Sequence, residues 1–101
     1  MLPSELEEIT KVCKALSDPT RLRIFLFLAR ETFCVNAIVS FLDISQSAVS
    51  QHLKILREAE LVKVEKRGCW MHYSANLKKA GEFADTISKI AEEEKKSGRK
   101  L

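Results

Sequence analysis

Residues 45–56, which read SQSAVSQHLKIL, guide the interpretation of the whole chain. At 3.6 residues per turn, Val49, Leu53 and Leu56 fall on one side of a helix and form an apolar stripe that can face a core. Another side has no acid before Glu58 and carries only hydrogen-bonding or cationic side chains, namely Ser47, Ser50, Gln51 and Lys54.

The polar side of this stretch favours contact with DNA. Small polar side chains near a helix N-terminus can enter a major groove that is about 12 Å wide. Gln can pair with adenine edges, while Ser and Lys can reach bases or phosphates. The alternative is the solvated face of an ordinary amphipathic helix, but such faces are usually rich in Glu as well as Lys. DNA recognition is therefore the preferred interpretation.

Length and composition are those of one small globular domain. The chain has 101 residues, 46% of them apolar, and a net charge of +3. This mild basicity permits a nucleic-acid partner without requiring one. Its apolar runs are too short to span a membrane, its N-terminus is acidic rather than signal-like, and its three cysteines do not make a disulfide framework. We expect a cytoplasmic protein with no membrane partner.

Helical periodicity predicts three helices before this stretch. Ser4 and Glu7 form a capping box for a helix over residues 5–16. Asp18-Pro19 starts a second helix, which extends to Arg30 and is apolar on nearly all sides, as a central core helix would be. Residues 34–42 predict a shorter third helix. Asp43-Ile44 then connects it tightly to the helix of residues 45–56, which gives a helix-turn-helix pattern.

The period changes after the fourth helix. Residues 62–66 alternate apolar and polar, and residues 70–73 favour a second strand, so a hairpin with a basic tip at Arg67-Gly68 is predicted. Asn76 can cap a last helix whose face from Ala80 to Ala91 is too apolar to be left in water. We expect residues 1–92 to form one domain for DNA binding and dimerisation, and residues 93–101 to form a charged, frayed tail.

The chain is thus predicted to be mainly α with a small β-hairpin, in the order α-α-α-α-β-β-α of a winged helix-turn-helix. It resembles the ArsR/SmtB family of transcriptional repressors in residues 15–22, in the pattern across residues 45–56, and in residues 62–73. The resemblance implies a homodimer, paired through its first and last helices, that blocks a palindromic promoter until an inducer releases it. The apolar positions expected at that interface are Leu6, Ile9, Phe83, Ile87 and Ile90.

Two features depart from the family's pattern. The family often has Gly after the reading helix, where this chain has Glu60, and a left-handed Glu costs about 1 kcal/mol or more relative to Gly. Many metal-sensing members carry Cys-Val-Cys-Asp in the third helix, where this chain has Cys34-Val35-Asn36-Ala37. Others bind zinc on the last helix through Asp, His and Glu, but the last helix predicted here has Glu82, Asp85 and a run of Glu and no His. Neither family metal site is intact.

The sensor therefore stays open. One hypothesis is an inducer that never touches a thiol, and the other is sensing of redox state or of a soft metal or metalloid ion by Cys13, Cys34 or Cys69. Cys13 lies on the apolar stripe of the first helix, where a buried thiol is commonly a small hydrophobe. Cys69 is expected to be exposed. The resemblance also allows Cys13 of one chain to pair with Cys34 of the other.

The predicted function is a sequence-specific DNA-binding repressor released by a small inducer. The chain is not expected to be an enzyme, because it has no acid/base pair, nucleophile constellation or glycine-rich phosphate loop. A winged-helix module that binds protein is the alternative from another class. The residues predicted to contact DNA are Ser45, Gln46, Ser47, Ser50, Gln51, His52, Lys54, Lys63, Lys66 and Arg67.

Overall fold

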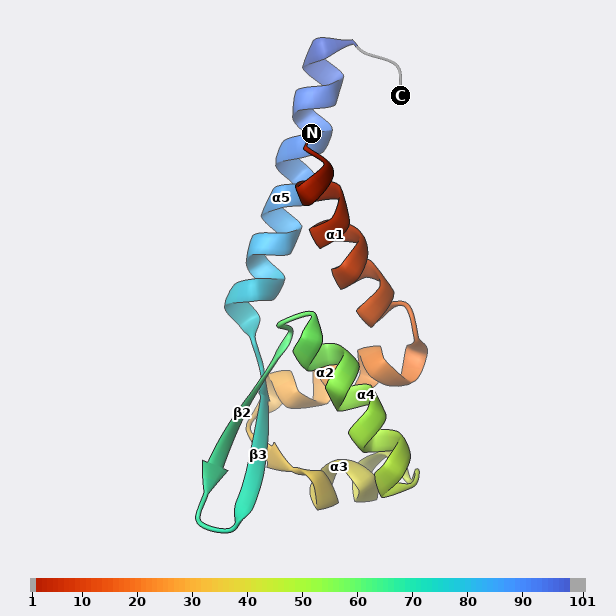
Figure 1. Cartoon of the computed structure of the whole chain (residues 1–101), viewed down its shortest axis with the longest axis vertical. Helices are drawn as coiled ribbons and strands as arrows, with labels where there is room; N and C mark the ends of the chain where they lie inside the picture. The colour runs from red at the N-terminus through yellow and green to blue at the C-terminus, as the bar shows by residue number, and fades with distance from the viewer. Residues whose placement is uncertain (1, 99–101) are drawn as a thin grey trace.

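A computed structural model describes residues 2–98 and has the predicted winged helix-turn-helix architecture (Figure 1). One end of the molecule holds the sheet and the middle helices, and the first and last helices lie beside each other at the other end. The elements, in chain order, are α1 (Pro3–Leu16), α2 (Pro19–Arg30), β1 (Phe33–Cys34), α3 (Val35–Leu42), α4 (Gln46–Glu58), β2 (Val62–Arg67), β3 (Trp70–Ala75) and α5 (Leu77–Ser97).

The sheet has one strand more than the sequence predicted. The hairpin of β2 and β3 is confirmed, and Arg67 lies opposite Trp70 across a turn of Gly68 and Cys69. The additional strand β1 pairs antiparallel with the other edge of β3, which gives the order β1-β3-β2. Two residues are too few to show an alternating pattern. This strand is recognised only through its pairing with a strand that lies far along the chain.

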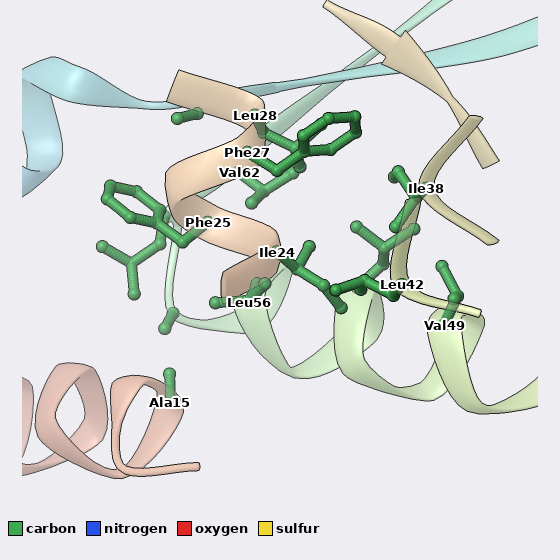
Figure 2. Packing of buried hydrophobic residues seen from close by; sticks show 14 of the residues in the cluster. Ala15, Ile24, Phe25, Phe27, Leu28, Ile38, Leu42, Val49, Leu56 and Val62 are labelled. Atoms are coloured by element: carbon green, nitrogen blue, oxygen red, sulfur yellow. The ribbon is translucent and has the colours of Figure 1, made fainter. Parts of the chain in front are cut away.

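The core forms around α2, as predicted. Ile24 and Leu28 of this helix are almost fully buried against residues of α3, α4 and the sheet (Figure 2). Asp18 caps the helix by accepting a hydrogen bond from the Arg21 amide at 3.0 Å, and this bond lowers the pKa of the Asp18 carboxyl. The expectation of burial on nearly all sides was too broad, because Leu22 and Leu26 are exposed in the single chain.

The start of α1 differs from the predicted capping box. Ser4 lies inside the helix, which begins at Pro3, and the Leu2 amide donates to the Glu5 carboxylate at 3.0 Å. Proline fits the first helical position because its fixed φ is helical and its missing N–H would have no partner there. The helix therefore begins before the serine that was expected to cap it.

The last helix extends further than expected. It continues through Ser97 and ends at Gly98, which has φ of 64° and donates its amide to the Glu94 carbonyl at 3.2 Å. Residues 93–97 of the expected tail are therefore helical, because Glu and Lys are good helix formers and a left-handed glycine is a favourable C-cap. Residues 99–101 of that tail lie outside the described part. The domain boundary after residue 92 stays a prediction.

Candidate DNA-binding interface

The helix α4 is held with its polar side outward. Ser45 caps it by accepting a hydrogen bond from the Ala48 amide at 3.1 Å, as predicted. Val49, Leu53 and Leu56 are 0%, 2% and 0% exposed, so the whole predicted stripe is covered by the core. Because three apolar side chains over two turns are fixed in the core, α4 cannot rotate about its axis. The opposite face must point to solvent.

The exposed face contains nearly all the residues that the sequence assigned to DNA on this helix. All of these side chains are exposed and none is a carboxylate, and they are Ser45, Gln46, Ser47, Ser50, Gln51 and Lys54. His52 is different. It is half-buried at the edge of the helix, with its ring Nδ1 at 3.4 Å from the Arg21 guanidinium. No pattern in the sequence indicated this contact, which joins residues that lie 31 positions apart.

The hairpin of β2 and β3, which we call the wing, supplies the remaining predicted cations. Lys63, Lys66 and Arg67 are all exposed on β2, and Arg67 lies 3.3 Å from the carboxylate of Glu65. The wing tip and the amino end of α4 lie toward the same end of the molecule (Figure 1). The sequence did not single out Trp70, whose side chain is 56% exposed beside this basic tip.

The junction after α4 answers the question raised by Glu60. This residue does adopt the left-handed conformation, with φ of 61°. Its carbonyl accepts a hydrogen bond from the Asn76 side chain at 2.9 Å, and its carboxylate lies 3.5 Å from the Lys79 ammonium. The same ammonium pairs with Glu8 of α1. The hydrogen bond between Lys79 and Glu8 lowers the pKa of the Glu8 carboxyl and raises the pKa of the Lys79 ammonium. One lysine thus connects α1, α5 and the end of α4.

The three thiols are not gathered in one place. Cys13 is exposed on α1 in the single chain, which contradicts the expectation of a buried thiol, because the core contacts of α1 are made by Val12 and Ala15. Cys34 is half-buried and Cys69 is exposed, and both line a recess of about 340 Å³ that Gln46 and Met71 also border. Within residues 2–98 no three His, Cys, Asp or Glu side chains are grouped to hold a metal ion.

The apolar residues assigned to a dimer interface lie on α1 and α5. Leu6 and Ile87 are 51% and 41% exposed. Ile9, Phe83 and Ile90 are half-buried, and Ile9 and Phe83 line a small recess of about 180 Å³ between the two helices. No residue of α5 is buried within the single chain. The apolar face predicted on this helix is therefore left largely uncovered.

Across residues 2–98, every helix is too short or too polar to span a lipid bilayer.

The middle of the chain matches a known protein family. Residues 18–64 match the family model described as bacterial regulatory protein, arsR family. A Synechocystis protein named transcriptional repressor SmtB homolog is 39% identical over 70 residues, which are 69% of this chain and 53% of that protein. The arsenical resistance operon repressor of Escherichia coli is 44% identical over 61 residues, which are 59% of this chain and 52% of that protein. The matched segment thus spans about half of each relative.

Solved structures extend the likeness to nearly the whole chain. An ArsR-like transcriptional regulator from Rhodococcus has a TM-score of 0.87 and 29% identity, covering 93% of this chain and 89% of its own. A homodimeric winged helix-turn-helix DNA-binding domain from Mycobacterium bovis has a TM-score of 0.73 and 26% identity, covering 90% and 83%. These relatives are regulators, and none of them is named as an enzyme, as expected for this chain. The chain belongs to the ArsR/SmtB family of winged helix-turn-helix transcriptional regulators.

Proposed function

We propose that this protein is a sequence-specific DNA-binding repressor that acts as a homodimer and is released from its operator by a small inducer. The observation that carries the proposal is the exposed face of α4, which has no carboxylate before Glu58 in the last turn, on a helix whose opposite face is fully buried. A helix anchored in this way can present one fixed set of side chains to a major groove. The protein would act in the cytoplasm, where the operator DNA is found.

The exposed residues divide into two roles. Ser47, Ser50 and Gln51 lie near the start of α4 and have the donors and acceptors that read base edges. Ser45 and Gln46 lie at the very end of the helix, beside them. Lys54 on α4 and the cations of the wing have long, flexible side chains suited to phosphates, and Arg67 would exchange its exposed Glu65 partner for one. The wing cations are Lys63, Lys66 and Arg67.

A homodimer would cover the apolar face of α5. Leu6 of α1 and Ile87 of α5 expose large apolar side chains that a second copy of the chain can bury, together with Ile9, Phe83 and Ile90. The Mycobacterium bovis domain of similar fold is described as homodimeric, which supports this assembly. Two copies related by a two-fold axis would place two reading helices on two half-sites, so the operator should be palindromic.

The first experiment selects a duplex from a random-sequence pool and then titrates the selected duplex against a scrambled one at two salt concentrations. We expect preference for the selected duplex, and affinity that falls steeply as salt rises because cations release counterions from phosphates. Gln51→Ala should reduce the preference more than Lys66→Ala, whereas Lys66→Ala should weaken both duplexes alike. Failure to bind any duplex would overturn the proposal.

The alternative of another class is a winged-helix module that binds protein. An acidic or apolar reading face would favour it, and the face of α4 is neither. The same titration separates the two hypotheses, since a protein-binding module would not discriminate between the selected and scrambled duplexes.

The inducer defines a second candidate function, a thiol-based sensor of redox state or of a soft metal or metalloid ion. The relative from Escherichia coli is named for arsenical resistance, which makes such an ion a reasonable inducer class for this chain. The observation that favours it here is the recess shared by Cys34 and Cys69, since thiolates and the Met71 thioether are soft ligands. Gln46, the first residue of the reading helix, also borders the recess, so an ion bound there could displace the Gln46 side chain.

Three single variants test this sensor. If the recess binds the ion, Cys34→Ser and Cys69→Ser should abolish release of DNA by arsenite, cadmium or a thiol oxidant. Cys13→Ser is the matched control, since Cys13 does not line the recess, and should respond like the wild type. Release that survives when Cys13, Cys34 and Cys69 are all replaced by Ser in one variant would exclude every thiol model and leave an inducer that does not touch cysteine.

A further inference from the structure

The side chain of Arg21 joins its own helix to two others, α1 and α4. It belongs to α2, and its Nε donates to the Ala15 carbonyl of α1 at 2.8 Å. Its Nη2 donates to the Lys14 carbonyl at 3.2 Å, and its Nη1 lies 3.4 Å from Nδ1 of His52 on α4. The two carbonyls belong to the last turn of α1, where backbone acceptors have no partner four residues further along the helix. The Lys14 carbonyl also accepts from the amide and the hydroxyl of Ser17, at 3.3 and 2.8 Å. A planar guanidinium that satisfies both has little freedom left.

The third contact fixes the proton of the imidazole. A guanidinium can only donate, so the nitrogen that faces it must present a lone pair. A proton on Nδ1 would point at a cation, and this holds even though 3.4 Å is long for a hydrogen bond. The neutral ring must then carry its proton on Nε2, because the bond made by one ring nitrogen determines the protonation of the other.

The second ring nitrogen of His52 is free to act outside the chain. Among residues 2–98, the ring makes no hydrogen bond other than the one with Arg21. The Nε2 atom of this ring has no hydrogen-bond partner within these residues and is not buried, so solvent can reach it. His52 follows Gln51 on α4 and precedes the exposed Lys54 by two positions, at the edge of the reading face. The acceptors that border a helix in the major groove are backbone phosphates.

We propose that Arg21 is a positioning residue for DNA binding, which holds His52 in the tautomer that donates from Nε2 to a backbone phosphate. The inference rests on the proposed function and assigns a role to a residue that contacts no DNA itself. It also describes how His52, which the sequence assigned to DNA contact, is held from behind by α2. Through Lys14 and Ala15, the same guanidinium ties the end of α1 to the reading helix.

The first test is spectroscopic and needs no DNA. Two-bond nitrogen–proton correlations on the full-length protein, at a pH where the ring is neutral, distinguish the two tautomers of His52. We expect the Nε2-protonated form in the wild type and a mixture of both forms in Arg21→Gln. The Gln side chain lacks the positive charge and the paired N–H donors of the guanidinium. A wild-type ring protonated on Nδ1, or a mixture in the wild type, would overturn the proposal.

The second test uses two amide replacements of His52 with the selected duplex. The Gln amide can place a donor near the position of Nε2, whereas the Asn amide reaches only the position of Nδ1. His52→Gln should bind within a few-fold of the wild type, and His52→Asn should bind about tenfold more weakly, as expected for loss of one hydrogen bond to a charged acceptor. Equal affinities for the two variants would overturn the phosphate contact. Neither variant alters Arg21, so this comparison holds even if Arg21→Gln does not fold.

The third test separates positioning from a general structural role. Arg21→Gln should weaken binding several-fold when His52 is present, but have little effect in the His52→Gln background, where no tautomer needs fixing. Equal losses in both backgrounds would mean that Arg21 acts only on stability. If the wild type binds no duplex at all, the proposed function fails, and the spectroscopic test still decides whether Arg21 sets the tautomer.

Discussion

The helices α4 and α5 begin alike and end up in different environments. Both have an apolar stripe, and each is capped by a polar side chain that accepts from an amide three residues on, Ser45 from Ala48 and Asn76 from Lys79. The stripe of α4 is covered completely by the other elements of the same chain. The stripe of α5, on a helix of 21 residues, contains no buried residue.

The difference teaches what an amphipathic pattern can and cannot predict. The pattern says that one face of a helix will be covered, because apolar surface is costly to leave in water. It does not say whether the cover comes from the same chain. In α4 the cover is the protein's own core, and the polar face is what remains for a partner. In α5 the apolar face itself is what remains, and a second copy of the chain would cover it.

The largest expected effect comes from truncating the covered stripe. Leu53→Ala removes a side chain that is 2% exposed, and the lost contacts and the cavity should lower the free energy of unfolding by about 2–5 kcal/mol. Urea denaturation of the purified protein measures it. Lys54→Ala, its exposed neighbour on the same helix, is the control and should change this free energy by less than about 0.5 kcal/mol. Similar losses in both variants would contradict the assignment of faces.

A charge on the uncovered stripe should act on assembly instead. Ile87→Glu places a carboxylate on the apolar face of α5, and we expect the dimer dissociation constant to rise about a hundredfold, in the range typical of a central interface residue. Sedimentation velocity at several concentrations measures it. Ser88→Glu, at the next and also exposed position, should leave assembly unchanged. Unfolding rather than dissociation of Ile87→Glu would show that the face is covered from within the chain.

A smaller effect is expected at the lysine that joins the two ends of the molecule. Lys79→Met keeps the length of the side chain but loses the ion pairs with Glu8 and Glu60, which should cost about 1 kcal/mol or less because both carboxylates are largely exposed. Lys78→Met is the control, since that ammonium is 87% exposed and lies 4.0 Å from its partner.

The pH dependence of this difference provides a second check. Because the folded protein holds the pKa of Glu8 below its ordinary value of 4.5, the pair contributes stability above pH 4.5 and loses it as the pH falls through the lowered value. Because the pKa of Lys79 is raised, the ion pair contributes its full stability up to pH 10.5, the ordinary pKa of a lysine. This stability is lost as the pH rises through the raised pKa of Lys79. The difference in free energy of unfolding between Lys79→Met and the wild type should therefore disappear in acid. A gap independent of pH would point to packing instead.

The smallest expected effect concerns the strained residue between these regions. Glu60→Gly relieves the left-handed conformation at φ of 61° and gives up the ion pair with Lys79, so a net gain of about 0.5–1 kcal/mol is expected. Thermal unfolding measures the change. Glu58→Gly, in the last turn of α4, should destabilise by about as much, because glycine is a poor helix former there. A loss in both variants would mean that the Glu60 ion pair outweighs the strain.

Local signals in the sequence predicted most of the elements for identifiable reasons. Asp18, Ser45 and Asn76 cap the helices they were expected to cap, and the hairpin turn lies at Gly68 and Cys69, one residue later than the predicted Arg67-Gly68. In each case the interaction lies within a few residues, so the sequence contains it. The helix α1 begins at Pro3 rather than after Ser4, because a proline and a capping serine, which both favour a helix start, lie within one turn of each other. The helical charge run before Ser97 was missed because a run of charges alone does not distinguish a solvated helix from a tail.

The sequence by itself determined the winged helix-turn-helix, the polar face of α4 and the basic wing, since period, caps and turn residues are local properties of a chain. Only the tertiary structure decided that β1 joins the sheet, that Lys79 links Glu8 with Glu60, and that Arg21 faces His52. Each of these contacts joins residues far apart in sequence, and such pairs meet only after the core around α2 has fixed the helices relative to one another.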